Sequence, residues 1–413
     1  MTTPTASPRS GFVIGLALLA ALAPFTTDMF LPSLPEIARD LDVSSTTTQL
    51  TLSVYLLMLG LSQLIIGPVS DAVGRRRPLM IGLALFLIGS LIAAFAPNFT
   101  VLLLARALQG AGGGVALVVS NASVRDRTEG AASVRLFSLL MTISGLGPIL
   151  APAIGGVLET TLGWRSVFWA LGVLALAAIL VSVKNLPESL PAEKRSSLSL
   201  RSVARDYGTI IRDRAFLIPA LAVGSSFMVL FAYIGGASIV YQEIYGLSPA
   251  AFGLVFGGTG VAVLLGAFVS TVLAHRWPAR RTALSGSLLM VLGAVVAIVS
   301  VIGGGGLPTV VVGVAILEFG LGLGMPSFMS LAMSSGHTLL GSRAALLGAM
   351  QFGFGAVATP IVGFVLSDEP ISWLLLLGGL ALVAPLLLLL HNRITPQVAT
   401  MPGTPTEPVT VAK

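Results

Sequence analysis

Gly67-Pro-Val-Ser-Asp71-Ala-Val-Gly74-Arg75-Arg76-Arg77-Pro78 forms the polar break between two long apolar runs, residues 48–70 and 78–97. Each run is long enough to cross a hydrocarbon core of about 30 Å as a helix that rises about 1.5 Å per residue. The chain carries further runs of this kind at 11–35, 100–122, 134–158, 166–186, 215–242, 249–274, 282–303, 308–334, 342–366 and 371–390. The sequence therefore predicts an all-α integral membrane protein with twelve transmembrane helices in two pseudo-symmetric six-helix halves.

The composition requires a lipid environment. Hydrophobic residues make up 55% of the chain and charged residues only 10%, with a mean hydropathy of +0.96; soluble chains carry about 25% charged residues. The net charge of +6 does not indicate nucleic acid, because in a membrane protein the placement of Lys and Arg matters more than their sum. There are no cysteines, and the three histidines, His275, His337 and His391, fall in predicted loops or at helix ends. We expect no metal site, no nucleic-acid partner and no enzymatic activity.

The placement of basic residues predicts the orientation. Arg106 falls inside a predicted helix, and only Arg39 and Arg165 fall on the predicted outer side, so all other members of the 23 Lys and Arg lie on the inner side. The positive-inside rule then places both termini in the cytoplasm and the protein in the inner (plasma) membrane. The sequence predicts an N-terminal bundle at 1–186, a cytoplasmic linker at 187–214, a C-terminal bundle at 215–391 and a disordered cytoplasmic tail at 392–413.

The loop at 67–78 resembles the signature of the major facilitator superfamily, in which a glycine, an acidic residue and a Gly-Arg-Arg/Lys run have this spacing. The two glycines permit close backbone approach and a tight turn, and the aspartate engages a neighbouring helix N-terminus and the arginines. We expect a cytoplasmic latch that breaks during transport, made by Gly67, Asp71, Gly74, Arg75 and Arg76. Ala72 stands where the family usually has a basic residue, and an ordinary positively charged loop is the alternative.

Two helices of the first half carry motifs that are similar to others of this superfamily. Leu102-Leu-Leu-Ala-Arg106-Ala-Leu-Gln109-Gly110 resembles the motif with an intramembrane arginine, whose insertion costs about 3 kcal/mol. Arg106 is interpreted either as a charge that helps to move protons or as a structural arginine bonded to backbone carbonyls of the first half. The run 145–156 resembles the antiporter motif of exporters, with generic small-residue packing as the alternative; its residues are Gly147, Pro148, Pro152, Gly155 and Gly156.

The first helix indicates the branch of the superfamily. Thr26-Thr27-Asp28-Met29-Phe30-Leu31-Pro32 resembles the bicyclomycin and chloramphenicol/florfenicol resistance branch of drug:proton antiporters, with Phe30 in place of the usual tyrosine. The resemblance is dense over 20–165 and thin in the second half. It implies a multidrug efflux transporter that uses protons as the coupling ion and no other cofactor.

Three ionisable residues are predicted to couple protons and substrate. Asp28 and Arg106 lie each about seven residues from the outer end of a helix, and so at one depth, about 10 Å below the outer surface. If they face one cavity, they pair in one state and part when Asp28 takes a proton or a substrate binds; a helix-terminal residue in the interface is the alternative for Asp28. Glu318, near the middle of a helix, is either a second proton site, a hook for cationic substrates, or a protonated structural residue. Further candidate cavity residues are Tyr55, Gln63, Gln109, Tyr233 and Gln351.

The function predicted from these features is alternating-access export of small amphipathic or apolar compounds, such as chloramphenicol-type antibiotics, in exchange for protons. An exporter of an endogenous metabolite or natural product, or a proton-coupled importer, remains open. A receptor or polytopic enzyme is disfavoured because the longest loop, of about thirty residues, has no nucleophile with a base. The expected partners are a small-molecule substrate and the lipid bilayer, and the expected state is a monomer.

Overall fold

The computed structural model describes residues 10–195, 199–336, 338–366 and 369–394, and over these residues it contains helices and no strands. Twelve of its helical segments are long and apolar enough to cross a membrane, which confirms the predicted fold class. The first half consists of α1 (Ser10–Asp28), η1 (Leu31–Ser33), α2 (Leu34–Asp40), α3 (Ser45–Val73), α4 (Arg76–Ala94), α5 (Phe99–Arg127), α6 (Gly130–Leu162) and α7 (Arg165–Asn185).

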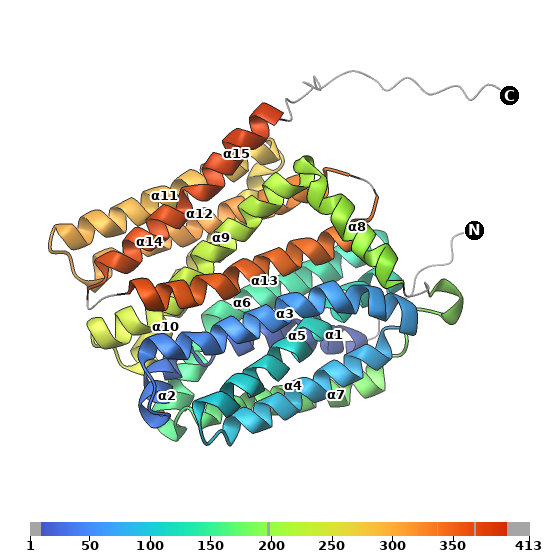
Figure 1. Cartoon of the computed structure of the whole chain (residues 1–413), viewed down its shortest axis with the longest axis horizontal. Helices are drawn as coiled ribbons and strands as arrows, with labels where there is room; N and C mark the ends of the chain where they lie inside the picture. The colour runs from blue at the N-terminus through green and yellow to red at the C-terminus, as the bar shows by residue number, and fades with distance from the viewer. Residues whose placement is uncertain (1–9, 196–198, 337, 367–368, 395–413) are drawn as a thin grey trace.

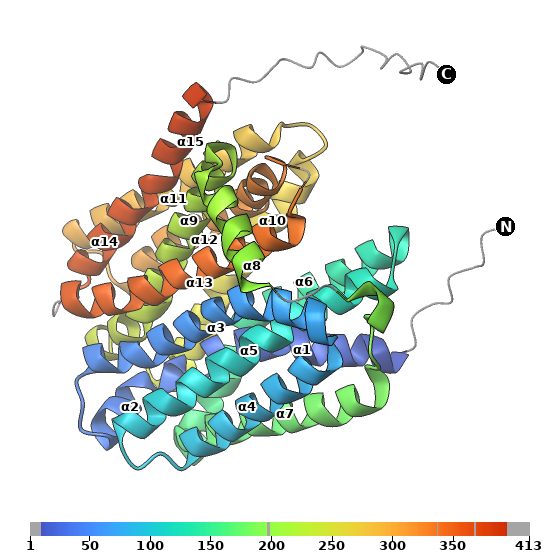
Figure 2. The same cartoon turned by 45° about the vertical axis from the view of Figure 1, so that its right-hand side comes forward.

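The second half follows a linker that holds η2 (Ala192–Lys194) and α8 (Leu200–Arg212). Its elements are α9 (Arg214–Ile239), the π-helical turn η3 (Val240–Ile244), α10 (Pro249–Leu273), α11 (Ala279–Ile302), α12 (Leu307–Met333), α13 (Leu340–Val365), α14 (Ile371–Ala381) and α15 (Val383–Ile394). Figures 1 and 2 show the helices of the first half, blue to green, mostly beneath those of the second, yellow-green to red. We call the end of the molecule that holds α2 the outer end and the end that holds α8 the inner end.

Two pairs of helices join the halves. α3 packs along α13, and α6 packs along α10, about as extensively as neighbouring helices within one half do. The predicted limits of the two bundles, 1–186 and 215–391, stay a prediction because packing continues across the boundary. Of the predicted tail, residues 395–413 lie outside the described residues.

The first span differs from the prediction of one helix over 11–35. α1 ends at Asp28, and the chain continues through the 3₁₀ turn η1 into the short helix α2. Pro32 and Pro35 each stand at the start of one of these elements. Proline has no N–H to donate to the preceding turn, so the helix is interrupted before Pro32 and restarts after it. Asp28 is therefore a helix-terminal residue, yet only 2% of its surface is exposed.

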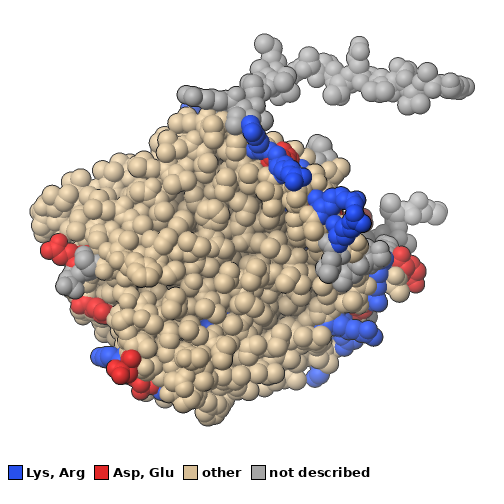
Figure 3. All heavy atoms as spheres, viewed as in Figure 1, with Lys and Arg blue, Asp and Glu red and all other residues tan. Residues whose placement is uncertain are grey.

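The surface separates into an uncharged belt and two charged ends. Figure 3 shows a broad belt of uncharged side chains, with most Lys and Arg of the visible face gathered at the inner end. At the outer end, Arg39 pairs with Glu36, and Arg165 donates to Asp40 at 2.6 Å. Many large apolar side chains are exposed on the belt, which suits contact with lipid rather than water.

The sequence predicted only a polar stretch for the linker, but the structure has a helix there. α8 is strongly amphipathic, and its Ile210 is buried in a cluster with Phe216 of the second half. Tyr207 of the same helix donates to the Leu64 carbonyl of α3 at 2.9 Å, in the first half. α8 thus connects the inner ends of both halves.

Candidate functional site

Arg106 is fully buried in α5 and is held by three acceptors of the first half. Its Nη1 atom donates to the Gln109 side chain at 2.9 Å and to the Thr26 carbonyl at 3.3 Å, and its Nε atom donates to the Thr51 carbonyl at 3.3 Å. Gln109 stands one turn further along α5 and donates in turn to Ser90 at 2.9 Å. These bonds tie α5 to α1, α3 and α4.

Two aromatic rings enclose the Arg106 guanidinium. Its central carbon lies 4.2 Å from the ring centroid of Phe30 and 4.5 Å from that of Tyr55. Cations over ring faces are stabilised by the ring quadrupole, by about 2 kcal/mol when they are desolvated. Phe30 therefore contacts the guanidinium through its ring face, while Tyr55 adds a hydroxyl that donates to the Ala23 carbonyl at 3.4 Å.

Asp28 lies at the depth of Arg106 but does not pair with it in this conformation. Phe30 packs on the Arg106 guanidinium, whereas no hydrogen bond or ion pair joins Asp28 to it in the described structure. Among the described residues Asp28 forms no ion pair, and its buried Oδ1 atom has no hydrogen-bond partner. On Arg106 the Nη2 atom is likewise without a partner. One unpaired acceptor and one unpaired donor thus lie at the same level of the first half.

Glu318 is the buried carboxyl group of the second half. It lies in α12 with 1% of its surface exposed, and its Oε1 atom has no partner within the described structure. Tyr233, on α9, shares a hydrogen bond of 2.6 Å with Thr259, so its hydroxyl is occupied. Its ring stacks on Phe256 at 5.2 Å and lies 6.1 Å from Trp373, which places Tyr233 in an aromatic cluster.

The antiporter motif lies where α6 meets both α1 and α10. A Cβ atom on Gly155 would lie 1.8 Å from the Met29 carbonyl oxygen, and one on Gly147 would lie 2.4 Å from the side chain of Pro24. On the other face of α6, Gly156 approaches the Pro249 carbonyl, and the carbonyl of Pro152 approaches Gly253; Pro148 likewise approaches Gly260. Backbone contact at these distances is available only to glycine. The motif therefore supports close packing within the first half and between the halves.

Arg75 anchors the loop of the predicted latch, but its partners all belong to the first half and the linker. It bonds Asp71 at 2.5 Å, Asp126 at 3.0 Å and Ser70 at 2.7 Å, and its backbone N–H donates to Glu188 at 2.8 Å. Burial lowers the pKa of Arg75, but the hydrogen bond to Asp126 and the charges of Asp71 and Asp126 raise it further, so it lies above its usual value. Asp71 and Arg75, two members of the predicted latch, are thus paired in this conformation, and the breaking of this contact during transport stays a prediction.

The linker contributes a carboxylate that the sequence did not reveal. Glu188 accepts from the backbone N–H groups of Arg75, Arg76 and Leu190. Burial raises the pKa of Glu188, but these three N–H groups lower it more, so that it lies below its ordinary value. Arg76 itself donates to the Val183 carbonyl at 3.0 Å, again within the first half.

The two glycines of the loop behave differently. Gly74 has φ of 95°, a left-handed conformation, and a Cβ there would lie 2.5 Å from Glu188, so the predicted tight turn and close approach are found. At Gly67 nothing lies within 4 Å of a Cβ, and the predicted close approach at that position is wrong for this conformation.

Asp71 and Gly67 line an inner pocket of about 230 Å³ together with residues at the start of α13. This position fits the expectation that Asp71 lies near the N-terminus of a neighbouring helix, here α13. Of the predicted cavity residues, Gln63 lines the same pocket and leaves its Nε2 atom without a partner in the described part of the chain. Gln351, on α13, is 8% exposed.

The described residues contain no group of three or more His, Cys, Asp or Glu side chains arranged to hold a metal, and His337 lies outside them. A second pocket of about 540 Å³ opens at the inner end between α6 and α10, lined by Ser133, Val134, Phe137, Ser138, Met141, Thr142, Leu264, Ala267, Phe268 and Thr271.

Comparison with known proteins gives concordant results. The family model described as Major Facilitator Superfamily matches residues 16–359. An "Uncharacterized MFS-type transporter YdgK" of Bacillus subtilis is 38% identical, over 87% of this chain and 90% of the relative. The "Bicyclomycin resistance protein homolog" of Haemophilus influenzae is 28% identical over 91% and 94%, and "Multidrug resistance protein D" of Escherichia coli is 30% identical over 83% and 86%.

Solved structures resemble the chain in fold. A human organic anion transporter, MFSD10 (TETRAN), is 18% identical with a TM-score of 0.66 and covers 94% of this chain and 100% of its own. A POT family transporter in complex with a thioalcohol-conjugated peptide is 15% identical with a TM-score of 0.75, over 94% and 98%. At these identities the likeness concerns the fold alone.

Proposed function

The chain belongs to the Major Facilitator Superfamily, and on that basis we propose that it is a proton-coupled multidrug exporter of the bicyclomycin/chloramphenicol resistance type. Membership confirms the resemblance read from the sequence, and the superfamily consists of transporters rather than enzymes. The names of the relatives, among them a bicyclomycin resistance homologue and two multidrug resistance proteins, support drugs as the substrate class. We take small amphipathic or apolar compounds, including chloramphenicol-type antibiotics, as the substrates.

Proton coupling is assigned to Asp28 because its buried carboxyl group lacks a partner while Arg106 has a donor to spare. This is the observation that carries the proposal. An unpaired carboxylate in a dry site is costly unless it is protonated, hydrated or paired with a cation. In the conformation described, Asp28 carries the transported proton. When α1 turns, the carboxylate reaches Nη2 of Arg106 and the proton leaves.

Arg106 fits this role because its other contacts need not break. The Thr26, Thr51 and Gln109 acceptors engage Nη1 and Nε, and they leave Nη2 for a carboxylate. The structural interpretation of Arg106 and the functional one are therefore compatible, because the bonds that hold the guanidinium leave its Nη2 atom unused. Glu318, buried and unpaired in the second half, is a second candidate for a proton or a cationic group.

Alternating access is proposed to proceed by exchange of contacts at the two ends. At the outer end the halves are joined by Ser45 to Glu243 at 2.7 Å, Gln49 to the Gly235 carbonyl at 2.8 Å, and Ser238 to the Leu31 carbonyl at 2.8 Å. At the inner end α6 and α10 leave the pocket of about 540 Å³. Export requires that the outer contacts separate while the inner ends of α6 and α10 close, a rocking of one half against the other.

The proposed location is the inner (plasma) membrane, with both termini cytoplasmic and the inner end facing the cytosol. The gathering of Lys and Arg at the inner end supports this orientation. We take the monomer as the working unit.

The function is tested by expressing the full chain in an efflux-deficient bacterial host and measuring accumulation of radiolabelled chloramphenicol and a panel of amphipathic drugs. We expect lower accumulation of at least one compound than in the empty host, and a return to the empty-host level after a protonophore is added. Accumulation that rises above the empty-host level would establish import instead. Unchanged accumulation of every compound in the panel would contradict drug export and would favour an endogenous product as the substrate.

A further inference from the structure

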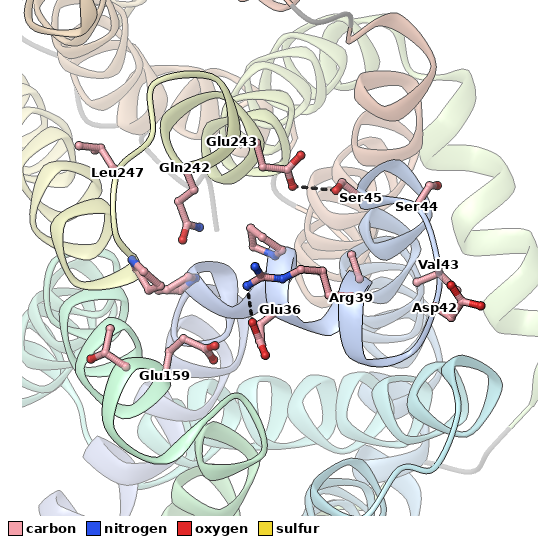
Figure 4. Close-up of a pocket in the computed structure, with 15 residues that line it drawn as sticks. Glu36, Arg39, Asp42, Val43, Ser44, Ser45, Glu159, Gln242, Glu243 and Leu247 are labelled. Carbon is pink, nitrogen blue, oxygen red and sulfur yellow. Dashed lines mark hydrogen bonds and ion pairs between the residues drawn. The ribbon is translucent and has the colours of Figure 1, made fainter.

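The end of α9 and the π-helical turn η3 hold the outer ends of the two halves together. The Gly235 carbonyl and the Ser238 side chain each form a hydrogen bond of 2.8 Å to the first half. Glu243 accepts from Ser45 at 2.7 Å, and Figure 4 shows this bond at the edge of an outer pocket of about 630 Å³ between the halves. A shift of this one segment would therefore change how the outer ends are joined.

The same segment lies beside the buried carboxyl group of the second half. α9 packs along α12, which carries Glu318. The Tyr233 and Tyr241 hydroxyls both lie close enough to Glu318 for its charge to act on them. None of these three residues has more than 2% of its surface exposed. The cluster is therefore dry, and hydrogen bonds and charges inside it act more strongly than they would in water.

Two members of this cluster lack a partner. The Glu318 Oε1 atom and the Tyr241 hydroxyl form no hydrogen bond within the described structure. The Tyr233 hydroxyl is engaged, since it shares a bond of 2.6 Å with Thr259. An unsatisfied carboxyl oxygen and an unsatisfied hydroxyl are both unfavourable in a dry site, and a bond between them would satisfy both. Tyr241 is therefore the donor available to Glu318 when the two approach more closely.

No positive charge balances Glu318 within the described span. α12 packs against α9, α10 and α11, and α10 has no ionisable side chain. The only Lys, Arg or His residues of α9 and α11 are in their first turns, at the inner end: Arg214, Arg280 and Arg281. An ionised carboxylate without a cation is stable in a dry site only if it gains hydrogen-bond donors. Glu318 is thus uncharged while Tyr241 stays unbonded, and its carboxylate would attract the Tyr241 hydroxyl.

The turn η3 gives the end of α9 a place at which to shift. The Tyr245 N–H donates to the Val240 carbonyl at 3.0 Å, five residues earlier, whereas an α-helix bonds four residues earlier. Such turns are rare and are frequent at functional sites. Tyr241 and Glu243 both lie within η3. A change from this turn to an α-helical one would therefore move the unbonded hydroxyl and an outer contact together.

We propose that Glu318 and Tyr241 together form a proton site that controls the outer contacts between the halves. With the proton bound, Glu318 is uncharged, Tyr241 stays apart and the outer contacts hold, as in the conformation described. When the proton leaves to water, Tyr241 donates to the carboxylate, η3 shifts, and the contacts made by Ser238 and Glu243 are released. The inference rests on the proposed role of Glu318 as a second proton site, but it requires neither drug export nor a proton on Asp28.

The distance between the outer ends of the two halves measures this opening directly. The chain has no cysteine, so Thr100→Cys and Thr309→Cys provide two unique sites for nitroxide labels, at the exposed starts of α5 and α12 in opposite halves. Double electron–electron resonance follows the full chain in lipid nanodiscs between pH 6 and pH 9, where exposed carboxylates stay ionised. The labelled parent and all its variants carry Asp28→Asn, so that the response does not depend on the proposed coupling residue.

We expect the population at the longer distance to rise about threefold from pH 6 to pH 9 in the labelled parent, and to stay at its pH 6 level in Glu318→Gln. Tyr241→Phe should move the midpoint of the rise to higher pH, because a carboxylate without the hydroxyl holds its proton more tightly. A merely structural role of the ring would leave the midpoint in place. Tyr245→Phe, the same change directly after η3, is the matched control and should respond as the parent does.

Two results would overturn the proposal: a rise of the parent's size in Glu318→Gln, or no rise in the parent. If Glu318→Gln does not fold, Tyr241→Phe decides, and a midpoint equal to that of the parent would overturn the proposal. Failure of drug export with this pH response intact would refute the proposed substrates and leave the proton site standing.

Discussion

Arg106→Lys is the substitution that most sharply probes the site in the first half. Lysine keeps the positive charge but replaces a planar group with five donors by a single nitrogen. A lysine nitrogen at the place of Nη1 retains the Gln109 and Thr26 acceptors and loses the bond from Nε to the Thr51 carbonyl. It also loses the flat stack between Phe30 and Tyr55.

The expected loss of stability follows from these contacts. A hydrogen bond from a charged group contributes about 1.5 kcal/mol or more, and weakened stacking on two rings costs about 1 kcal/mol in all. The sum, about 2.5 kcal/mol, corresponds to a decrease of about 3 °C in the midpoint of thermal unfolding for a chain of 413 residues.

The assay is thermal unfolding of the purified full chain in one detergent, at one scan rate, followed by intrinsic fluorescence. Arg39→Lys is the control, because the Arg39 side chain is 75% exposed and its partner is retained by lysine. The control should unfold at the temperature of the unaltered chain. Equal midpoints for Arg106→Lys and the unaltered chain would refute the argument that the three acceptors and two rings stabilise the first half.

Two further predictions concern packing and pH. Gly155→Ala should strongly reduce the folded yield, because its Cβ would lie 1.8 Å from the Met29 carbonyl oxygen. Gly67→Ala is the control and should leave the yield unchanged, because the space around its Cβ is open. Fluorescence-detected size exclusion measures the folded yield of both variants. A low yield from both variants alike would contradict the packing described for α6. For Glu188 the folded pKa lies below the ordinary 4.5, so the stabilisation that its carboxylate gives is present above pH 4.5 and is lost as the pH falls through the folded pKa. Glu188→Gln should therefore make the unfolding temperature less dependent on pH between 7 and 3.5. An unchanged pH dependence in this variant would disprove the argument.

The spans and their order were predictable because the length of an apolar run and its hydropathy depend on sequence alone. The breaks inside the spans were harder to predict. The sequence predicted one helix over 11–35, although Pro32 and Pro35 indicated a break there. The amphipathic helix α8 had a readable pattern as well, since Val203, Tyr207 and Ile210 recur at helical spacing.

Partners of the site residues were predictable only where they are close in sequence. Gln109 stands three residues after Arg106, which is one helical turn, but the Thr26 and Thr51 carbonyls reach it from other helices. Glu188 lies 113 residues from Arg75, and nothing in its neighbourhood distinguishes it from an ordinary linker glutamate.

The direction in which a helix faces is the other quantity that the sequence left open. Depth placed Asp28 and Arg106 at one predicted level, but depth does not say which way each side chain points, and no ion pair joins the two in the described structure.

The central claim is that Asp28 carries the proton that is exchanged for substrate. It is tested most directly in proteoliposomes with a trapped pH-sensitive dye, by imposing a gradient of a substrate identified in the drug panel and recording proton movement in the opposite direction. The account predicts proton movement for the unaltered chain and for the control Asp206→Asn on α8, and none for Asp28→Asn of equal folded yield. Full substrate-driven proton movement by Asp28→Asn would contradict it.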